Sequence, residues 1–342
     1  MSAQTTQQQL PFVSVVMPVR NEAGYIERSL GSVLAQDYPL EQMEIIVADG
    51  MSTDQTRALI AGFQTRFQRL KVIDNPGKIA PTGLNRAIAQ ASGDIIVRVD
   101  GHCEIAPDYL RRCVHYLQSG AADGVGGPIE TIGETLSARV IATAMSSAFG
   151  VGGSAFRTIK DQTMLTDTVA FPAYTRTIIE RAGPYDEELV RNQDDEYNYR
   201  LRKLGAKILL AADVQSRYYS RSTFRKVFKQ YYQYGYWKVR VLQKHPRQMS
   251  LRQFVPPAFV AALLVGVLAA SFLPLGAWLL AGILGCYLLA NLLASARSAS
   301  KSDAFGSHLL LLPIVYTALH ISYGLGFLVG LIKFAPRWQT AA

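Results

Sequence analysis

Short apolar runs alternate with stretches of helical periodicity over the first 120 residues. In the intervening stretches apolar positions recur every three or four residues, as at Ile26, Leu30 and Val33, which is the spacing of one helix face. Continuous β-branched runs separated by such helices are typical of βαβ units with a parallel sheet. We therefore expect an α/β domain, with strands at Phe12–Pro18, Glu44–Ala48, Leu70–Ile73 and Asp94–Val99.

Two aspartates, Asp49 and Asp100, follow the ends of the second and fourth runs. Ligands of open parallel sheets bind outside the carboxyl ends of the strands, so this position predicts a binding site. The structural alternative is that each aspartate accepts hydrogen bonds from the backbone of its own turn. Ser52 and Gln55 also have the spacing of a capping box, which predicts that a helix opens at Ser52.

From Phe254 onward the chain is almost entirely apolar. Three stretches are each long enough to cross a hydrocarbon core of about 30 Å, and Pro274 leaves only a tight turn between the first two, which predicts an antiparallel hairpin. Basic residues on both sides of this pair place its ends in the cytosol. The third stretch either crosses or is re-entrant or interfacial, because Lys333 and Arg337 follow it. The stretches are Phe254–Leu273, Leu275–Ala294 and Leu309–Ile332.

The net charge of +9 has its source in one segment. From Arg217 to Arg252 there are ten Lys or Arg and no Asp or Glu. Its place directly before the apolar stretches favours contact with anionic lipid headgroups over a phosphorylated substrate. No zinc-finger or RNP-type pattern accompanies the charge, so no nucleic-acid partner is expected.

The chain is expected to have five parts. These are a disordered lead at 1–10, the α/β domain at 11–215, basic aromatic interfacial helices at 216–253, a membrane domain with about three hydrophobic helices at 254–333, and a tail at 334–342. The three cysteines lack a disulfide or CxxC pattern, and the first ten residues lack the features of a signal peptide. We therefore expect the α/β domain to remain in the cytosol.

Three polar clusters are candidates for chemistry. Asp100 and His102 flank a glycine and can share a divalent cation with phosphate oxygens. The consecutive carboxylates at 194–196 either complement the dipole of a helix start or repel one another enough to create a general base. The aromatic segment Gln230–Trp237 either lies at headgroup depth or covers a bound sugar; the two roles are compatible.

Four blocks together resemble the family 2 glycosyltransferases. They are similar to that family's first strand with its turn, its uridine-binding strand, the strand leading into its DxD metal motif, and its acidic motif. The resemblance implies a GT-A (Rossmann-like) nucleotide-diphospho-sugar transferase domain followed by C-terminal transmembrane helices, with inverting chemistry. Within the family, the Asp-Gly-His motif and the aromatic segment resemble the ExoA-type enzymes of succinoglycan-like exopolysaccharide assembly. The blocks are Val15–Glu22, Ile45–Asp54, Gly93–His102 and Gln193–Leu201.

The resemblance also implies individual roles. Asp194 would be the base, because aligning Arg200 and Leu201 with the family's arginine-leucine pair places it at the catalytic aspartate; Asp195 is the second choice. Asp100 and His102 would hold Mg²⁺ or Mn²⁺, with His102 standing where the family has an aspartate. Contacts to the donor nucleotide would come from Pro18, Arg20, Glu22, Asp49, Lys78 and Asp100. The sugar would be covered by Gln230, Tyr236 and Trp237.

The expected reaction is transfer of a single sugar from a UDP-sugar, with UDP-glucose first, to a polyprenyl-diphosphate-linked saccharide. It would take place at the cytosolic face of a bacterial-type inner membrane. The alternatives are a polyprenyl-phosphate glycosyltransferase, a processive polysaccharide synthase and a non-catalytic membrane scaffold. Because no arginine precedes Trp237 and no spans flank the α/β domain on its N-terminal side, a processive synthase is disfavoured.

Overall fold

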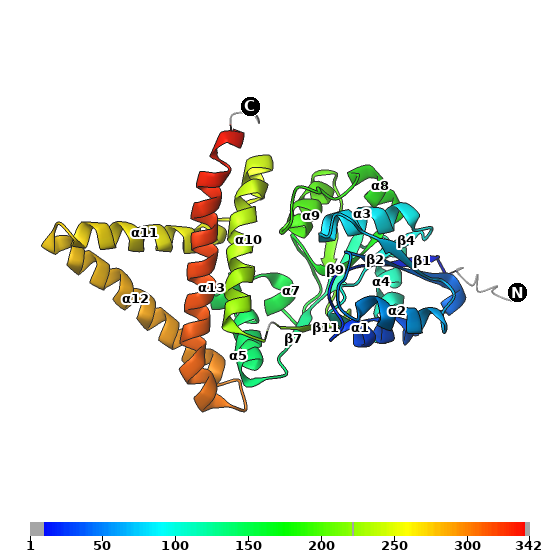
Figure 1. The fold of residues 1–342 in the computed structure, drawn as a ribbon, viewed down its shortest axis with the longest axis horizontal. Helices are drawn as coiled ribbons and strands as arrows, with labels where there is room; N and C mark the ends of the chain where they lie inside the picture. The colour runs from blue at the N-terminus through cyan, green and yellow to red at the C-terminus, as the bar shows by residue number, and fades with distance from the viewer. Residues whose placement is uncertain (1–9, 221, 339–342) are drawn as a thin grey trace, which may run out of the picture. The chain divides into compact units, whose positions relative to one another are not determined.

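The computed structural model describes residues 10–220 and 222–338. The expected disordered lead therefore lies outside the described residues except for Leu10, as do the last four residues of the tail. Two compact units make up the chain (Figure 1). The first comprises residues 1–129, 160–187 and 197–217, and the second comprises 130–159, 188–196 and 218–342.

An eight-stranded sheet forms the centre of the first unit, in the order β3-β2-β1-β4-β9-β6-β10-β8. The first four strands in sequence pair in parallel, and β9 runs antiparallel to both of its neighbours. All four predicted runs form strands. The strands are β1 (Val13–Val19), β2 (Met43–Asp49), β3 (Leu70–Asp74), β4 (Ile95–Arg98), β6 (Gly124–Gly127), β8 (Met164–Leu165), β9 (Ala170–Thr175) and β10 (Ile208–Leu210).

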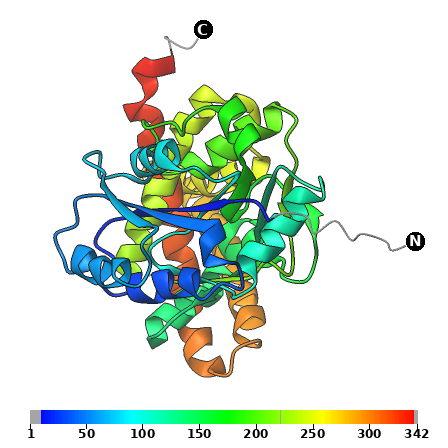
Figure 2. The same ribbon diagram turned by 90° about the vertical axis from the view of Figure 1, so that its right-hand side faces the viewer.

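Helices cover both faces of this sheet, which is why β2 is buried along its whole length. Figures 1 and 2 show α3 on one face, with α1 and α2 on the other. The helices of the first unit are α1 (Ile26–Leu34), α2 (Thr56–Gln64), α3 (Ala80–Gln90), α4 (Tyr109–Gln118) and α8 (Arg176–Ala182), and α9 (Gln193–Lys203) begins in the second unit and ends in the first.

The strand order creates a switch point between β1 and β4. From β1 the chain adds β2 and then β3 on one side, and it returns to place β4 on the other side of β1. Loops that leave neighbouring strands on opposite sides of such a point open a crevice at the carboxyl edge of the sheet. The segments that begin at Arg20 and Val99 are therefore brought together there.

The predicted capping box at Ser52 was wrong, because α2 begins at Thr56. The Ser52 hydroxyl instead donates to the Asp49 carboxylate (2.5 Å) and accepts from the backbone N–H of Asn21 (2.9 Å). Asp54 takes over the role at the helix start, since its carboxylate accepts from the Thr56 N–H at 3.0 Å. Contacts with the loop after β1 thus outweigh the local capping signal.

The second unit is mainly helical. Three short helices lie between residues 136 and 158. These and the longer helices are α5 (Leu136–Met145), α6 (Ala148–Val151), α7 (Ala155–Thr158), α10 (Phe224–Lys244), α11 (Val255–Ala270), α12 (Pro274–Ala299) and α13 (Phe305–Lys333). The remaining elements are β5 (Cys103–Ile105), β7 (Ile129–Ile132), β11 (Ser216–Tyr219) and the 3₁₀ turns η1 (Leu40–Gln42), η2 (Pro246–Gln248), η3 (Leu251–Phe254) and η4 (Ala335–Trp338).

Three helical stretches of the described chain are long and apolar enough to cross a membrane. Figure 1 shows α11 and α12 joined at one end as a hairpin, as predicted from Pro274. The three differ in burial. In the apolar 18-residue segment of α13, 44% is buried, against 17% and 11% in the corresponding segments of the α11 and α12 stretches. The stretches are Leu251–Ala270, Pro274–Ala299 and Phe305–Lys333.

Candidate functional site

Backbone strain marks the carboxyl edge of the sheet. Asn21, Met51 and Lys78 have φ angles of 54°, 56° and 61°, and they lie in the loops after β1, β2 and β3. A left-handed conformation is uncommon for residues other than glycine and costs on the order of 1–3 kcal/mol. A fourth such residue, Asn192 (φ 63°), directly precedes α9. Four of the five such residues in the described chain thus fall beside predicted site residues, and the fifth, Phe171 (φ 45°), lies in β9.

The switch point brings Glu22, Asp100 and His102 into one cluster. His102 Nδ1 donates to Glu22 Oε1 at 2.9 Å, and both side chains are about one-sixth exposed. The Asp100 carboxylate accepts from Arg98 Nε at 2.8 Å and from Arg98 Nη2 at 3.2 Å. The sequence did not reveal the partners Glu22 and Arg98, although Arg98 ends β4 only two positions before Asp100.

These groups suit a cation only in part. Among the described residues, no group of three or more His, Cys, Asp or Glu side chains is placed to hold a metal ion. A carboxylate and an imidazole instead offer two ligands, and the carboxylate also pairs with Arg98. Such a pair fits a divalent cation that takes its other ligands from a diphosphate, whereas it does not fit a closed protein cage.

Asp49 is held inside the protein. Its side chain is fully buried, accepts from the Ser52 N–H and hydroxyl, and lies 3.3 Å from Arg57 Nε. Asp49 therefore accepts hydrogen bonds from its own turn, as the structural alternative predicted. Its contact with the uracil or ribose stays a prediction.

The other predicted donor contacts line the same edge of the sheet. Pro18 lies in β1, and Arg20 is exposed directly after it. Lys78 is exposed two residues before α3, and its N–H donates to the Asn75 carbonyl oxygen at 3.0 Å. A lysine at the N-terminal end of a helix adds its charge to that of the helix dipole, which favours a bound anion.

The acidic motif at the start of α9 is held by side chains from α10 and from His245, the residue that follows it. Lys238 Nζ lies 2.8 Å from Asp195 Oδ2, and the lysine is only 3% exposed. His245 Nε2 lies 3.0 Å from Glu196 Oε1. Sequence reasoning missed both partners, because nothing in their spacing links residues about 45 positions apart. Asp195 is thus engaged in an ion pair and Glu196 in a hydrogen bond within the second unit.

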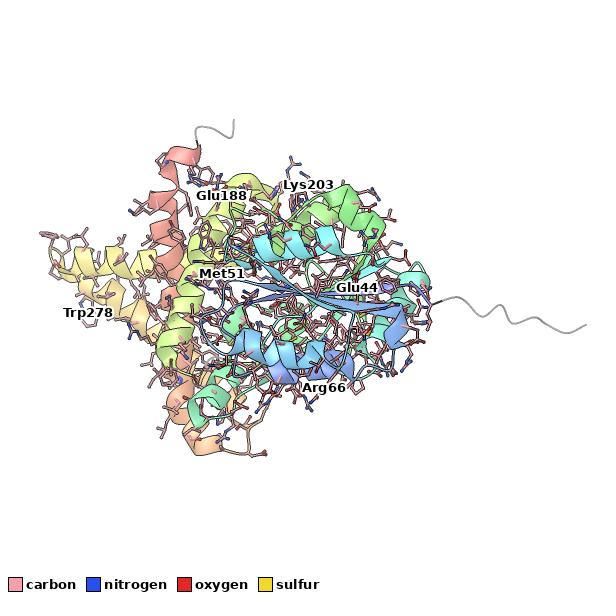
Figure 3. All side chains as sticks on the ribbon, turned by 45° about the vertical axis from the view of Figure 1, so that its right-hand side comes forward. Glu44, Met51, Arg66, Glu188, Lys203 and Trp278 are labelled. Carbon is pink, nitrogen blue, oxygen red and sulfur yellow. The ribbon has the colours of Figure 1, made fainter. Side chains whose placement is uncertain are left out.

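The loop before α9 is fixed to α10 as well. Asn192 Nδ2 donates to the Tyr234 carbonyl oxygen at 2.9 Å. Glu188 accepts from Arg240 Nε at 2.8 Å. It also pairs with Lys244 (2.8 Å) and with Arg337. The hydrogen bond from Arg240, supported by Lys244, lowers the pKa of Glu188 to about 2. Figure 3 labels Glu188 beside the ends of α10 and α13.

The three predicted sugar-covering residues all lie on α10. Tyr236 and Trp237 pack against Phe334, with ring centroids 4.9 and 5.7 Å apart. Gln230 is buried and donates to the Tyr234 hydroxyl at 2.9 Å, and its Oε1 has no hydrogen-bond partner within the described chain. Packing accounts for the two aromatic residues, and the covering role stays a prediction.

Comparison with known proteins identifies the family. A family model described as "Glycosyl transferase family 2" matches residues 14–182. The succinoglycan biosynthesis protein ExoA of Rhizobium meliloti (strain 1021) is 32% identical over 291 residues, which cover 78% of this chain and 86% of that protein. This chain is a family 2 glycosyltransferase. The family and ExoA-type resemblance seen in the sequence is confirmed.

Other relatives of the glycosyltransferase extend this likeness. A dolichyl N-acetyl-α-D-glucosaminyl phosphate 3-β-D-2,3-diacetamido-2,3-dideoxy-β-D-glucuronosyltransferase of Methanococcus voltae is 29% identical, with 94% of this chain and 98% of that protein covered. Among solved structures, the mannosyltransferase PcManGT of Pyrobaculum calidifontis, in complex with GDP-Man and Mn²⁺, has a TM-score of 0.59 at 20% identity, covering 95% of this chain and 88% of its own. S. aureus TarS 1-349 has a TM-score of 0.51 at 19% identity, with 90% of each chain covered. These likenesses confirm the predicted GT-A fold.

Proposed function

We propose that this glycosyltransferase moves one sugar from a UDP-sugar to a polyprenyl-diphosphate-linked saccharide at the cytosolic face of a membrane. UDP-glucose is the first candidate for the donor. The observation that carries the proposal is the cluster of Glu22, Asp100 and His102 at the β1/β4 switch point, where α/β sheets bind nucleotides. The names of two relatives support the acceptor class, since one acts in succinoglycan biosynthesis and the other on a dolichyl-phosphate-linked sugar.

On the donor side, Asp100 and His102 would hold Mg²⁺ or Mn²⁺, which supplies positive charge to the leaving diphosphate. Glu22 fixes the His102 ring by accepting from Nδ1, so Nε2 would be the nitrogen that binds the cation. Arg98 orients the Asp100 carboxylate through two hydrogen bonds. Lys78 and the amino end of α3 add further positive charge for the diphosphate.

On the acceptor side, Asp194 takes the proton of the attacking hydroxyl. That oxygen bonds to the anomeric carbon as the bond to the diphosphate breaks, so one displacement inverts the anomeric configuration. Lys238 offsets the charge of Asp195, and His245 donates a hydrogen bond to Glu196, which limits the repulsion between these carboxylates and Asp194. Because Asp195 is paired with the buried Lys238, its basicity is lowered, which favours Asp194 as the base.

The test compares Asp194→Asn with Asp303→Asn, an exposed aspartate between α12 and α13. Each purified protein receives UDP-glucose with Mn²⁺ and either a polyprenyl-diphosphate-linked sugar or polyprenyl phosphate, and the products are analysed by mass. We expect one added hexose on the lipid-linked sugar, no transfer by Asp194→Asn, and retained stabilisation of that variant by UDP and Mn²⁺. Normal turnover by Asp194→Asn would refute the base. Polymeric product or a preference for the bare phosphate would refute the acceptor.

A further inference from the structure

Helix α13 packs against α10 along its carboxyl-terminal half. The two helices run in the same direction, since Tyr232 lies beside Gly326, Tyr236 beside Gly330 and Gln243 beside Phe334. The approach is close: a Cβ atom added to Gly326 would lie 2.0 Å from the Tyr232 carbonyl oxygen. Small residues at such a spacing are what bring two helix backbones into contact.

The other half of α13 is bound to α6 and to the turn that precedes it. His320 Nε2 donates to the Phe149 carbonyl oxygen at 2.8 Å, and the Tyr316 hydroxyl donates to Ser147 Oγ at 2.9 Å. Three apolar side chains on this half, Leu312, Val315 and Leu319, are buried. Protein therefore covers one side of α13 over most of its length.

Helix α10 is not a membrane helix, because it carries six Lys or Arg. Two of them lie where α13 packs: Lys238 pairs with Asp195, and Arg240 pairs with Glu188. If α13 crossed the hydrocarbon, the parallel α10 would enter with it and bring these ion pairs and the start of α9. Charged groups are expensive at that depth, and an irregular loop such as 188–192 is not tolerated where lipid reaches it.

The α11–α12 hairpin has the opposite character. No charged residue or histidine lies between Phe254 and Ala296, whereas Arg252 and Arg297 flank the hairpin. Its tip exposes Phe272 (77%) and Trp278 (78%), and Figure 3 shows Trp278 near the joined end. An apolar surface of this extent with cations at both of its ends fits lipid hydrocarbon bounded by headgroups.

We propose that the bilayer is entered only by the α11–α12 hairpin and that α13 remains on the side that holds α10 and the acidic motif. The carboxyl terminus then lies on the same side as the start of α9, although α13 is apolar enough to span. The proposal does not depend on the identity of donor or acceptor. A failure of the proposed function in an activity assay would therefore leave it unaffected.

Single cysteines test this topology in the full-length protein. In a Cys286→Ala background, which keeps the buried Cys103 and Cys113, a cysteine is placed at Lys203, Asp303 or Trp338. All three positions are exposed. Lys203 ends the helix that carries the acidic motif and reports its side. A membrane-impermeant maleimide is applied to right-side-out cells and, separately, to inverted vesicles.

We expect the maleimide to label all three variants in the same preparation and none of them in the other. Labelling of Trp338→Cys in the preparation opposite to Lys203→Cys would show that α13 crosses and would overturn the proposal. Labelling of Asp303→Cys opposite to Lys203→Cys would overturn it as well, because the hairpin would then fail to return. Thermal unfolding of each variant at the temperature of the Cys286→Ala protein confirms that the substitutions leave the fold intact.

Discussion

Replacing Asp195 with asparagine should destabilise the protein through Lys238. The lysine is 3% exposed, and its ammonium group lies 2.8 Å from the Asp195 carboxylate. Asparagine keeps the size of the side chain and removes its charge. The substitution thus leaves a buried ammonium group beside a neutral amide, without creating a cavity.

The size of the effect follows from the burial of the two partners. Removing one partner of a fully buried ion pair costs about 3–5 kcal/mol. Because Asp195 is 31% exposed, water compensates part of the loss, and we take the lower end, about 3 kcal/mol. Deprotonating a lysine at pH 7.5 costs about 4 kcal/mol, which sets an upper limit, since the ammonium group can lose its proton instead.

A double-mutant cycle with Lys238→Met measures this coupling. Asp195→Asn alone should lower the melting temperature of the detergent-solubilised protein by about 5 °C. Asp195→Asn/Lys238→Met removes both charges, so most of the lost stability should return. Thermal unfolding of the four proteins, compared at one scan rate, gives the coupling energy.

Two results would refute the reasoning. Additive losses in the cycle would mean that Lys238 and Asp195 do not stabilise each other. Transfer activity provides the second criterion. The stable double variant could still bind UDP and yet lose transfer as completely as Asp194→Asn does. In that case Asp195 acts as the base instead of as the partner of Lys238. Recovery of both stability and transfer would support the assignment to Asp194.

Three further predictions rest on other contacts. Glu188→Gln should lower the free energy of unfolding by about 2 kcal/mol at pH 7, after allowance for solvent screening. Because folding lowers the pKa of Glu188 from 4.5 to about 2, this contribution is present above about pH 5 and is lost as the pH falls toward 2. Urea titrations of the two proteins should therefore converge in acid. Gly326→Leu should lower the free energy of unfolding by more than about 3 kcal/mol, because the new side chain forces α10 and α13 apart. At Gly282 an added Cβ would have no neighbouring heavy atom within 4 Å, so Gly282→Leu should unfold at the same temperature as the unchanged protein. Glu22→Gln should raise the Mn²⁺ concentration for half-maximal transfer about tenfold or more, whereas Glu27→Gln, exposed on α1, should leave it unchanged.

The parallel sheet could be predicted because its signal is local. Strands buried on both faces are continuous apolar runs, and helices between them keep a regular period, so four strands were found within one or two residues of their ends. The positions of Asp49 and Asp100 at strand ends followed from the same pattern. Local pattern alone also gave a wrong helix start at Ser52, where long-range bonds to Asn21 and Asp49 decide the turn.

Partners that are distant in sequence could not be predicted. The bond from His102 to Glu22 depends on β4 returning to the side of β1, and Asp195 meets Lys238 because α10 packs beside the start of α9. Each contact joins residues more than 40 positions apart. Hydrophobic periodicity specifies which face of an element is buried, but it does not specify the element that buries it.

The same limit bears on the number of membrane spans, which in the topology proposed above is smaller than hydropathy indicates. A window average counts apolar residues, and α13 passes that test together with the stretches of α11 and α12. An apolar helix has two ways to leave water, by entering lipid or by packing against protein, and composition is similar in both cases. The glycines of α13 distinguish them, because Gly326 and Gly330 each allow the α10 backbone to approach more closely than any side chain would permit. A helix already committed to a charged neighbour in this way cannot also be surrounded by lipid.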